Sequence, residues 1–185
     1  MERLSPPRAR FDPYASRINR DRSPWRTVSV PYATIVVGSL LPFLFLADVM
    51  PVLPPLGFLM FLGWRVMRPG LMPLWAGVPL GAFDDLFSGQ PYGSAILLWS
   101  VAMIALEIIE TRFPWRGFWQ DWFTVSLGAC LYIFVAMLIS GASLTPAMVI
   151  ASGPQLIVAI LIYPFLSQLI AGFDRFRLSR ARRIG

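Results

Sequence analysis

The sequence predicts an all-α fold, a polytopic membrane protein with six transmembrane helices. Hydrophobic residues make up 56% of the 185 residues, and charged residues make up only 14%. A soluble domain carries roughly 25% charged residues, so this chain has too little charge to cover a soluble surface. The mean hydropathy of +0.62 agrees with that conclusion. We therefore expect most of the chain to lie within a bilayer.

Six segments are read as membrane spans, because a transmembrane helix needs about 20 mostly apolar residues. They are residues 27–47, 49–64, 70–87, 91–109, 122–140 and 146–171. The second span is short and is interrupted by Pro51, Pro54 and Pro55. We expect its outer half to be irregular, which a bilayer tolerates only where protein or water satisfies the backbone. The alternative is a five-span arrangement in which this segment is re-entrant or interfacial.

The arginines predict the orientation. All 16 basic residues are arginines, and in a six-span arrangement every one falls on the same side of the membrane. They are Arg3, Arg8, Arg10, Arg17, Arg20, Arg22, Arg26, Arg65, Arg68, Arg112, Arg116, Arg175, Arg177, Arg180, Arg182 and Arg183. The opposite side carries Asp48, Asp84 and Asp85 and no basic residue. By the positive-inside rule both termini are cytoplasmic, and a five-span arrangement would lose this agreement. Trp64 and Trp122 fall at the predicted cytoplasmic boundary, where an indole N–H reaches water.

Two basic tails flank the predicted membrane domain, which spans residues 27–172. Residues 1–26 are rich in Arg, Pro and Ser and lack helical periodicity. We expect this tail to be disordered and to lie on anionic lipids, which attract each nearby basic residue by about 1 kcal/mol. The alternative is that the tail only enforces topology. Residues 173–185 form the second basic cytoplasmic tail, and we expect no nucleic-acid partner.

The residue inventory excludes several kinds of site. The chain has no histidine and a single cysteine, Cys130, so a disulfide framework, a Cys/His zinc site and a His-based triad are ruled out. It also has no P-loop, no Rossmann glycine fingerprint and no metal-ligand motif. We therefore expect no enzyme activity, no catalytic residue, and no cofactor or metal.

The most informative stretch places small residues and a carboxylate at regular spacing. Gly77, Gly81, Asp85 and Gly89 recur at every fourth residue, which predicts a single stripe on one helix. The Gly77-x-x-x-Gly81 spacing permits close approach of a second helix in lipid. The following residues 88–90 predict a tight turn, and the proline after them suits the first turn of the next helix.

Asp85 lies near the non-cytoplasmic end of the third span, where a carboxylate needs a partner or a water-filled niche. Three interpretations stay open. Asp85 or Ser88 satisfies backbone N–H groups at the turn or at the start of the fourth helix. Alternatively, Asp85 forms part of an interaction site for another membrane protein, or it serves as a proton relay or catalytic carboxylate. Asp84 points about 100° away on a helix, so the pair does not face one substrate, and we expect Asp84 to face headgroups or a partner.

The fourth and the last predicted spans also carry polar residues or prolines. Glu107 and Glu110 lie at the end of the fourth span, where an acidic residue opposes the helix dipole. We expect a nearby arginine to offset them in a salt-bridged turn, with a cytoplasmic docking patch as the alternative. Pro154 and Pro164 predict kinks in the last span, and Gln155 is expected to pair with a neighbouring helix.

The Gly/Asp stretch resembles the signature of the rod shape-determining protein MreD family. That pattern runs Gly, three residues, Asp-Leu, one or two residues, Gly, three residues and Gly. On this chain it selects Gly81, Asp85, Leu86, Gly89 and Gly93. The proline-bearing entry to a short second span and the Tyr163-Pro164-Phe165 run before a basic tail also resemble that family. The long N-terminal tail and the doubled aspartate depart from it.

The resemblance implies a non-enzymatic subunit of the bacterial cell-elongation machinery in the inner membrane. In the MreD family the protein works with MreC, and through it with the MreB filament, RodA and a class B penicillin-binding protein. The family fold is similar to that of substrate-binding subunits of energy-coupling-factor transporters. On this basis Gly77, Gly81, Asp85, Gly89, Gly93 and Pro164 are the candidate structural or partner-binding residues.

An alternative function is a small-molecule-binding membrane subunit of a vitamin transporter. Six spans, intramembrane carboxylates and the family's fold similarity motivate it. Such subunits typically carry an Ala-x-x-x-Ala pair in the first helix. The first span here lacks that pair, which speaks against the transporter interpretation.

Overall fold

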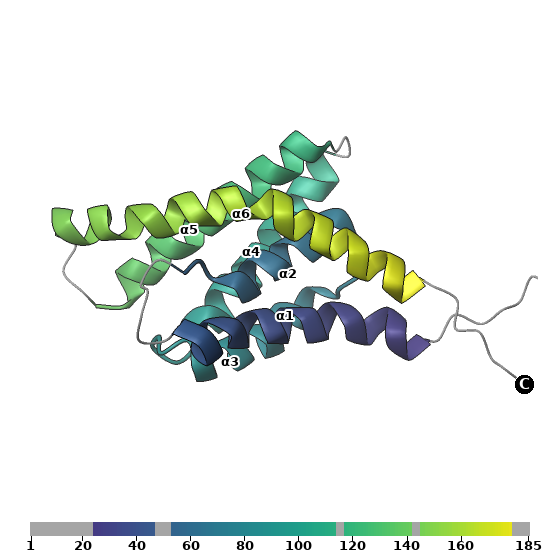
Figure 1. Cartoon of the computed structure of the whole chain (residues 1–185), viewed down its shortest axis with the longest axis horizontal. Helices are drawn as coiled ribbons and strands as arrows, with labels where there is room; N and C mark the ends of the chain where they lie inside the picture. Colours follow the sequence, from purple (N-terminus) through teal and green to yellow (C-terminus); the bar gives the residue numbers. More distant parts are fainter. Residues whose placement is uncertain (1–23, 47–52, 114–116, 142–144, 179–185) are drawn as a thin grey trace, which may run out of the picture.

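The computed structural model describes residues 24–46, 53–113, 117–141 and 145–178 (Figure 1). Within these ranges the chain forms helices and no strand, which confirms the all-α prediction. The predicted N-terminal tail up to residue 23, Pro51 and the last seven residues lie outside the described residues. Asp48 lies outside them as well.

Four helices are long and apolar enough to cross a membrane, and they indicate a membrane-embedded protein. They are α1 (Pro24–Leu46), α4 (Ser94–Arg112), α5 (Phe118–Ile139) and α6 (Pro146–Leu178). Their outer faces carry large exposed apolar side chains, as expected of helices that contact lipid.

The second and third helices are much shorter than the other four. α2 (Leu56–Met67) has 12 residues and α3 (Gly77–Phe87) has 11, with a 3₁₀ turn, η2 (Leu74–Ala76), before α3. At 1.5 Å per residue, each is about 16–18 Å long, against a hydrocarbon core of about 30 Å. Prolines at 54 and 55 precede α2 and a Pro-Gly pair at 69 and 70 follows it. The predicted irregular stretch before this helix is present, since residues 53–55 are not helical.

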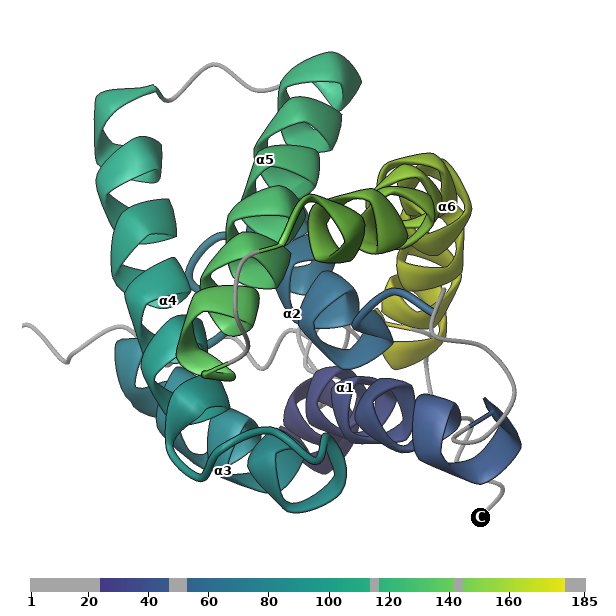
Figure 2. The same cartoon turned by 90° about the vertical axis from the view of Figure 1, so that its left-hand side faces the viewer.

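α2 forms the centre of the bundle, with α1, α4, α5 and α6 around it (Figure 2). The ten residues from Gly57 to Val66 are all buried. Aromatic rings dominate this core: Phe58 stacks on Tyr132 with centroids 4.2 Å apart, and Phe61 packs on Trp99 at 4.8 Å. A short helix that is apolar except for Arg65 is therefore stabilised by being surrounded rather than by its own length.

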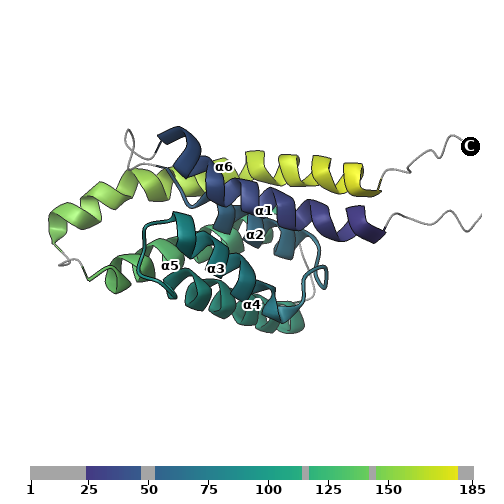
Figure 3. The ribbon, with the colours of Figure 1, turned by 90° about the horizontal axis from the view of Figure 1, so that it is seen from below.

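Several predicted helix ends differ from the observed ones. α4 begins at Ser94, so Pro91 lies in the preceding turn and not in the first helical turn as predicted. α6 continues to Leu178, so residues 173–178 are helical, whereas the sequence predicts that the C-terminal tail begins at residue 173. The described ends of the chain, at the start of α1 and the end of α6, lie at the same end of the bundle (Figures 1 and 3).

Candidate functional site

The predicted glycine stripe forms the contact between α3 and α4. A Cβ on Gly77 would lie 2.9 Å from the carbonyl oxygen of Trp99, and one on Gly81 would lie 2.7 Å from that of Ala95. Such distances leave no room for any side chain, so the two backbones touch at these positions. The expected close helix approach is confirmed.

The stripe ends at Asp85, and the last two signature glycines serve the turn. Gly89 and Gly93 have φ angles of +67° and +94°, in the left-handed region that favours glycine. Neither would clash with its surroundings if it carried a Cβ. Gly89 therefore does not lie on the helix stripe as predicted. The two residues are required for backbone conformation rather than for close packing.

Asp85 caps α4 from the neighbouring helix. Its carboxylate accepts hydrogen bonds from the backbone N–H of Gly93 at 2.9 Å, Ala95 at 2.9 Å and Ile96 at 3.3 Å, and from the Ser94 hydroxyl at 3.3 Å. The Ser94 N–H donates to the carbonyl of Pro91. The N–H groups at the start of a helix have no partner within the helix itself. In the first turn of α4, every one of them thus has an acceptor. The negative charge also lies at the favourable end of the helix dipole.

Asp84 is buried as well, on a different face of α3. Its carboxylate accepts a hydrogen bond of 3.4 Å from the Tyr132 hydroxyl of α5. The expectation that Asp84 faces headgroups is wrong, because its side chain is only 9% exposed and points into the bundle. The two aspartates point in different directions, as predicted. Asp85 accepts hydrogen bonds from α4, whereas Asp84 accepts one from α5.

At the opposite end of the bundle, a buried arginine pairs with the two predicted glutamates. Arg65 of α2 is 1% exposed and forms ion pairs with Glu107, through Nη2, and with Glu110, through Nη1 at 2.7 Å. The expected compensating arginine is therefore present, but it comes from α2 and not from the adjacent turn. Arg65 ties the end of α2 to the end of α4.

A second polar cluster joins the end of α6 to α1 and α2. Asp174 accepts hydrogen bonds from Arg68 and, at 2.7 Å, from Arg177. Arg177 also donates to the carbonyl of Thr27 at 3.1 Å. That carbonyl has no helical donor, because the residue four positions later is Pro31. The guanidinium of Arg177 further lies 5.7 Å from the ring centre of Trp64, within cation–π range.

Pro164 likewise leaves one carbonyl of α6 without a helical donor. It cannot donate to the carbonyl of Ile160, and the indole N–H of Trp122 in α5 donates to that oxygen at 2.9 Å. Trp122 therefore does not direct its N–H to water as predicted. Trp64 does not either, since it is fully buried and donates to the Thr34 hydroxyl.

A side chain of α6 donates a hydrogen bond to the backbone of the irregular segment before α2. The Gln155 amide donates to the carbonyl of Leu53 at 2.9 Å. The sequence predicts that Gln155 pairs with a neighbouring helix, but its partner is a backbone carbonyl of the non-helical segment before α2. A polar side chain in an apolar helix here supplies what water would supply in a soluble protein.

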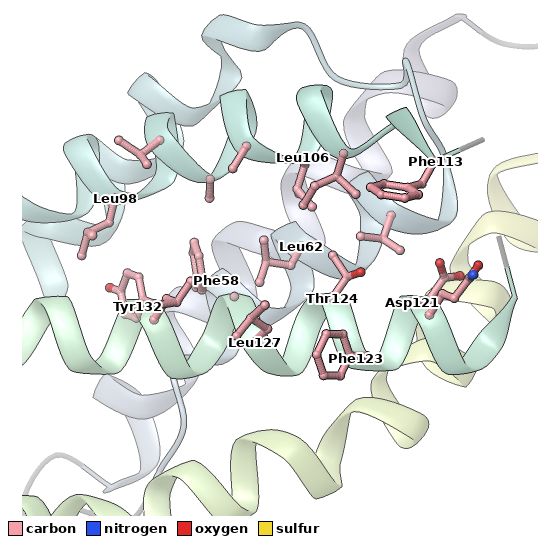
Figure 4. Close-up of a pocket in the computed structure, with 18 of the residues that line it drawn as sticks. Phe58, Leu62, Leu98, Leu106, Phe113, Asp121, Phe123, Thr124, Leu127 and Tyr132 are labelled. Atoms are coloured by element: carbon pink, nitrogen blue, oxygen red, sulfur yellow. The ribbon is translucent and has the colours of Figure 1, made fainter. Parts of the chain in front are cut away.

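A long apolar groove of about 700 Å³ separates α4 from α5. In Figure 4, Leu98 and Tyr132 mark one end of it and Phe113 and Asp121 the other, with Leu62 of α2 on its floor. The walls are almost entirely aliphatic and aromatic, and the polar side chains Gln120, Asp121 and Thr124 belong to the Asp121 end. Nothing in the apolar pattern of α4 and α5 predicted that the two helices diverge.

The sequence interpretation missed Arg65, Tyr132 and Trp122. Arg65 carried a usable signal, because an arginine inside an apolar helix of 12 residues has to find a counter-charge. Tyr132 and Trp122 carried none, since aromatic residues in apolar spans are mostly packing residues. Among the described residues, no cluster of acidic or cysteine side chains could hold a metal.

Comparisons with protein-family models, with curated proteins and with solved structures found no match to this chain.

Proposed function

We propose that this chain is an integral membrane scaffold of the bacterial cell-elongation complex, a member of the MreD family. It works in the inner membrane beside MreC, and through MreC it couples the MreB filament to peptidoglycan synthesis by RodA and a class B penicillin-binding protein. The observation that carries this proposal is the run from Gly81 to Gly93, whose spacing resembles the family signature. Its geometry supports a structural role: Gly81 permits contact, Gly89 and Gly93 form the turn, and Asp85 caps α4.

The proposed topology has six crossings and two cytoplasmic termini. Arg65 joins the end of α2 to the end of α4, and Arg177 joins the end of α6 to the start of α1. Asp85 joins the end of α3 to the start of α4 at the other end of the bundle. These links support an even number of passes, with α2 counted as a short crossing at the centre of the bundle and α3 as a short crossing beside α1 and α4. The arrangement proposed is the one shared by substrate-binding subunits of energy-coupling-factor transporters.

The positions of the charged residues support the proposed scaffold role. Arg65, Asp85 and Asp174 all contact groups of the same chain, and each joins two helices. Their geometry is what a rigid membrane body needs in order to present its outer apolar faces to partner helices. The polar groups thereby hold the bundle together, and partners are recognised by its surface.

Depletion in a rod-shaped bacterium that carries this gene tests the proposal. We expect depleted cells to widen and round, and labelled cell-wall precursors to lose their normal pattern of insertion along the cylinder. Wild-type protein supplied from a second copy should restore both, and affinity capture of the restored protein should recover MreC. Depleted cells that stay rod-shaped with normal precursor insertion would refute the scaffold role.

A further inference from the structure

We propose that Asp84 is a proton-binding site, a carboxyl group that keeps its proton at neutral pH inside the folded bundle. The protonated group donates to the Ser39 hydroxyl of α1 and accepts a hydrogen bond from the Tyr132 hydroxyl of α5. Folding of the chain at pH 7 therefore takes up one proton. This inference concerns the interior of the bundle and does not depend on a role in cell elongation.

The hydrogen bonds around Asp84 do not suit a negative charge. An ionised carboxylate offers about four lone-pair sites, and its bonds from hydroxyl groups are about 2.5–2.7 Å long. The bond that Asp84 accepts from Tyr132 is 3.4 Å long. Asp85, the next residue, accepts bonds from three backbone N–H groups and a hydroxyl at the start of α4, two of them 2.9 Å long. Of the two neighbouring carboxyl groups, Asp85 is therefore the one whose surroundings stabilise an anion.

Within the described residues, no arginine forms an ion pair with Asp84. The arginines of the ion pairs lie at the ends of α2 and α6, where their partners are Glu107, Glu110 and Asp174. Glu107 lies about 20 Å along α4 from Ser94, which contacts the end of α3. The Asp84 side chain is only 9% exposed, so water does not replace the missing cation. A buried carboxyl group without a counter-charge takes up a proton, because an isolated charge costs far more.

The groups that face Asp84 from the surrounding helices are neutral or negative. Ser39 of α1 and Tyr132 of α5 present hydroxyl groups to it. From α4 the Trp99 indole lies beside the Tyr132 hydroxyl, and α3 itself contributes Asp85. The charged residue of α2 lies in its last turn, at the other end of the bundle. These helices thus offer nothing that compensates a second negative charge beside Asp85.

The Ser39 hydroxyl oxygen indicates where the proton of Asp84 is directed. Ser39 is 8% exposed, and within the described residues its oxygen has no hydrogen-bond partner. Buried polar atoms without a partner are uncommon and costly. A protonated carboxyl group has one O–H donor and keeps an acceptor on its other oxygen. Asp84 can therefore donate to Ser39 and accept from Tyr132 at the same time, and one proton removes both the unpaired oxygen and the uncompensated charge.

Infrared difference spectroscopy of the full chain in detergent, at pH 7, tests the proposal. We expect a C=O stretching band of a protonated carboxylic acid that shifts in deuterated water and is absent from Asp84→Asn. This variant should fold, because the amide is uncharged and similar in size to the acid. Asp121→Asn is the matched control, at a partly exposed carboxylate of α5, and should keep the band. A wild-type spectrum without the band, or an equal band in Asp84→Asn, would overturn the proposal.

Tyr132→Phe tests the site in a second way and does not require Asp84→Asn to fold. It removes the hydrogen bond to the carboxyl oxygen of Asp84, so the band should persist and move to higher frequency. An unchanged frequency in Tyr132→Phe would contradict the proposed geometry.

The pH dependence of unfolding measures the bound proton directly. Between about pH 5 and pH 7 the unfolding equilibrium constant of the wild type should rise about tenfold more per pH unit than that of Asp84→Asn, because unfolding releases the proton. Equal slopes for the two proteins would refute proton uptake. Wild-type stability that falls when sodium is replaced by choline, without a difference in slope, would show that a metal cation neutralises Asp84 instead. These outcomes are independent of cell shape, so they do not coincide with failure of the depletion test.

Discussion

The indole N–H of Trp122 donates to the carbonyl of Ile160 at a distance of 2.9 Å, across the contact between α5 and α6. This is the carbonyl that Pro164 leaves without a helical donor. A similar replacement occurs in α1, where Arg177 donates to the Thr27 carbonyl that Pro31 leaves free. At both of these prolines a neighbouring helix supplies the donor that the helix itself lacks.

We expect Trp122→Phe to destabilise the protein by about 1–3 kcal/mol, because it leaves the Ile160 carbonyl without a donor while keeping an aromatic ring. The measurement is the free energy of unfolding in detergent micelles, followed by circular dichroism in denaturant. Trp119→Phe is the control, since Trp119 is largely exposed and its substitution should change stability by less than about 0.5 kcal/mol.

A double-mutant cycle with Pro164→Ala identifies the cause. Alanine at position 164 restores an N–H that donates to Ile160, so Trp122→Phe should cost less in that background than in the wild type. An equal cost in both backgrounds would show that Trp122 acts through packing alone.

The cap supplied by Asp85 gives a second prediction. Asp85→Ala removes the acceptor for three backbone N–H groups and one hydroxyl at the start of α4. We expect a loss of about 2 kcal/mol or more in unfolding free energy, with faster proteolysis of the turn between α3 and α4. Asp85→Asn keeps one oxygen and should fall between the wild type and alanine. An Asp85→Ala protein as stable as the wild type would contradict the capping role.

Gly81 gives a third prediction, one of steric origin. In Gly81→Ala the new methyl group would lie 2.7 Å from the Ala95 carbonyl oxygen and equally close to the Cα of Ile96. Backbone atoms cannot move aside as a side chain does, so α3 and α4 have to separate, at a cost of about 1–3 kcal/mol. Gly172→Ala is the matched control, because Gly172 is also helical and has open space around it. That substitution should be neutral or stabilising by about 0.5–1 kcal/mol, and a similar loss in both variants would contradict the close-contact role.

The sequence predicted the parts of this structure that depend on local pattern. Hydrophobic content indicated helices in lipid, the Gly77 and Gly81 spacing indicated a close contact, and an N–H partner at the start of α4 was one of the interpretations open for Asp85. Each of these follows from residues near one another in the chain. The helix ends were less well predicted, since the turn at Gly93 and not Pro91 sets the start of α4.

The long-range pairings could not be predicted in the same way. Arg65 lies 42 and 45 residues from its two glutamates, and Trp122 lies 38 residues from Ile160. Which helices meet depends on the packing of the whole bundle around α2, and a single sequence carries no direct record of that packing. The length of α2 could be predicted in part, because the flanking prolines limit the helix. Its position at the centre of the bundle could not, because the prolines do not determine it.

Arg177 gives the last prediction. Its guanidinium is buried and has three partners: the Asp174 carboxylate, the Thr27 carbonyl and the ring of Trp64. Arg177→Met keeps much of the side-chain volume but removes every donor, and it leaves Asp174 with Arg68 as its remaining ion-pair partner among the described residues. Because breaking a buried ion pair costs about 3–5 kcal/mol, and Arg68 offsets part of that cost, we expect a loss of about 2–3 kcal/mol in unfolding free energy. Arg175→Met is the matched control, two residues earlier and exposed on the same helix, and should be close to neutral. Accelerated hydrogen exchange at the start of α1 in Arg177→Met alone would show that the effect passes through the Thr27 carbonyl. Equal stability of the two variants would mean that the end of α6 does not hold α1 in place.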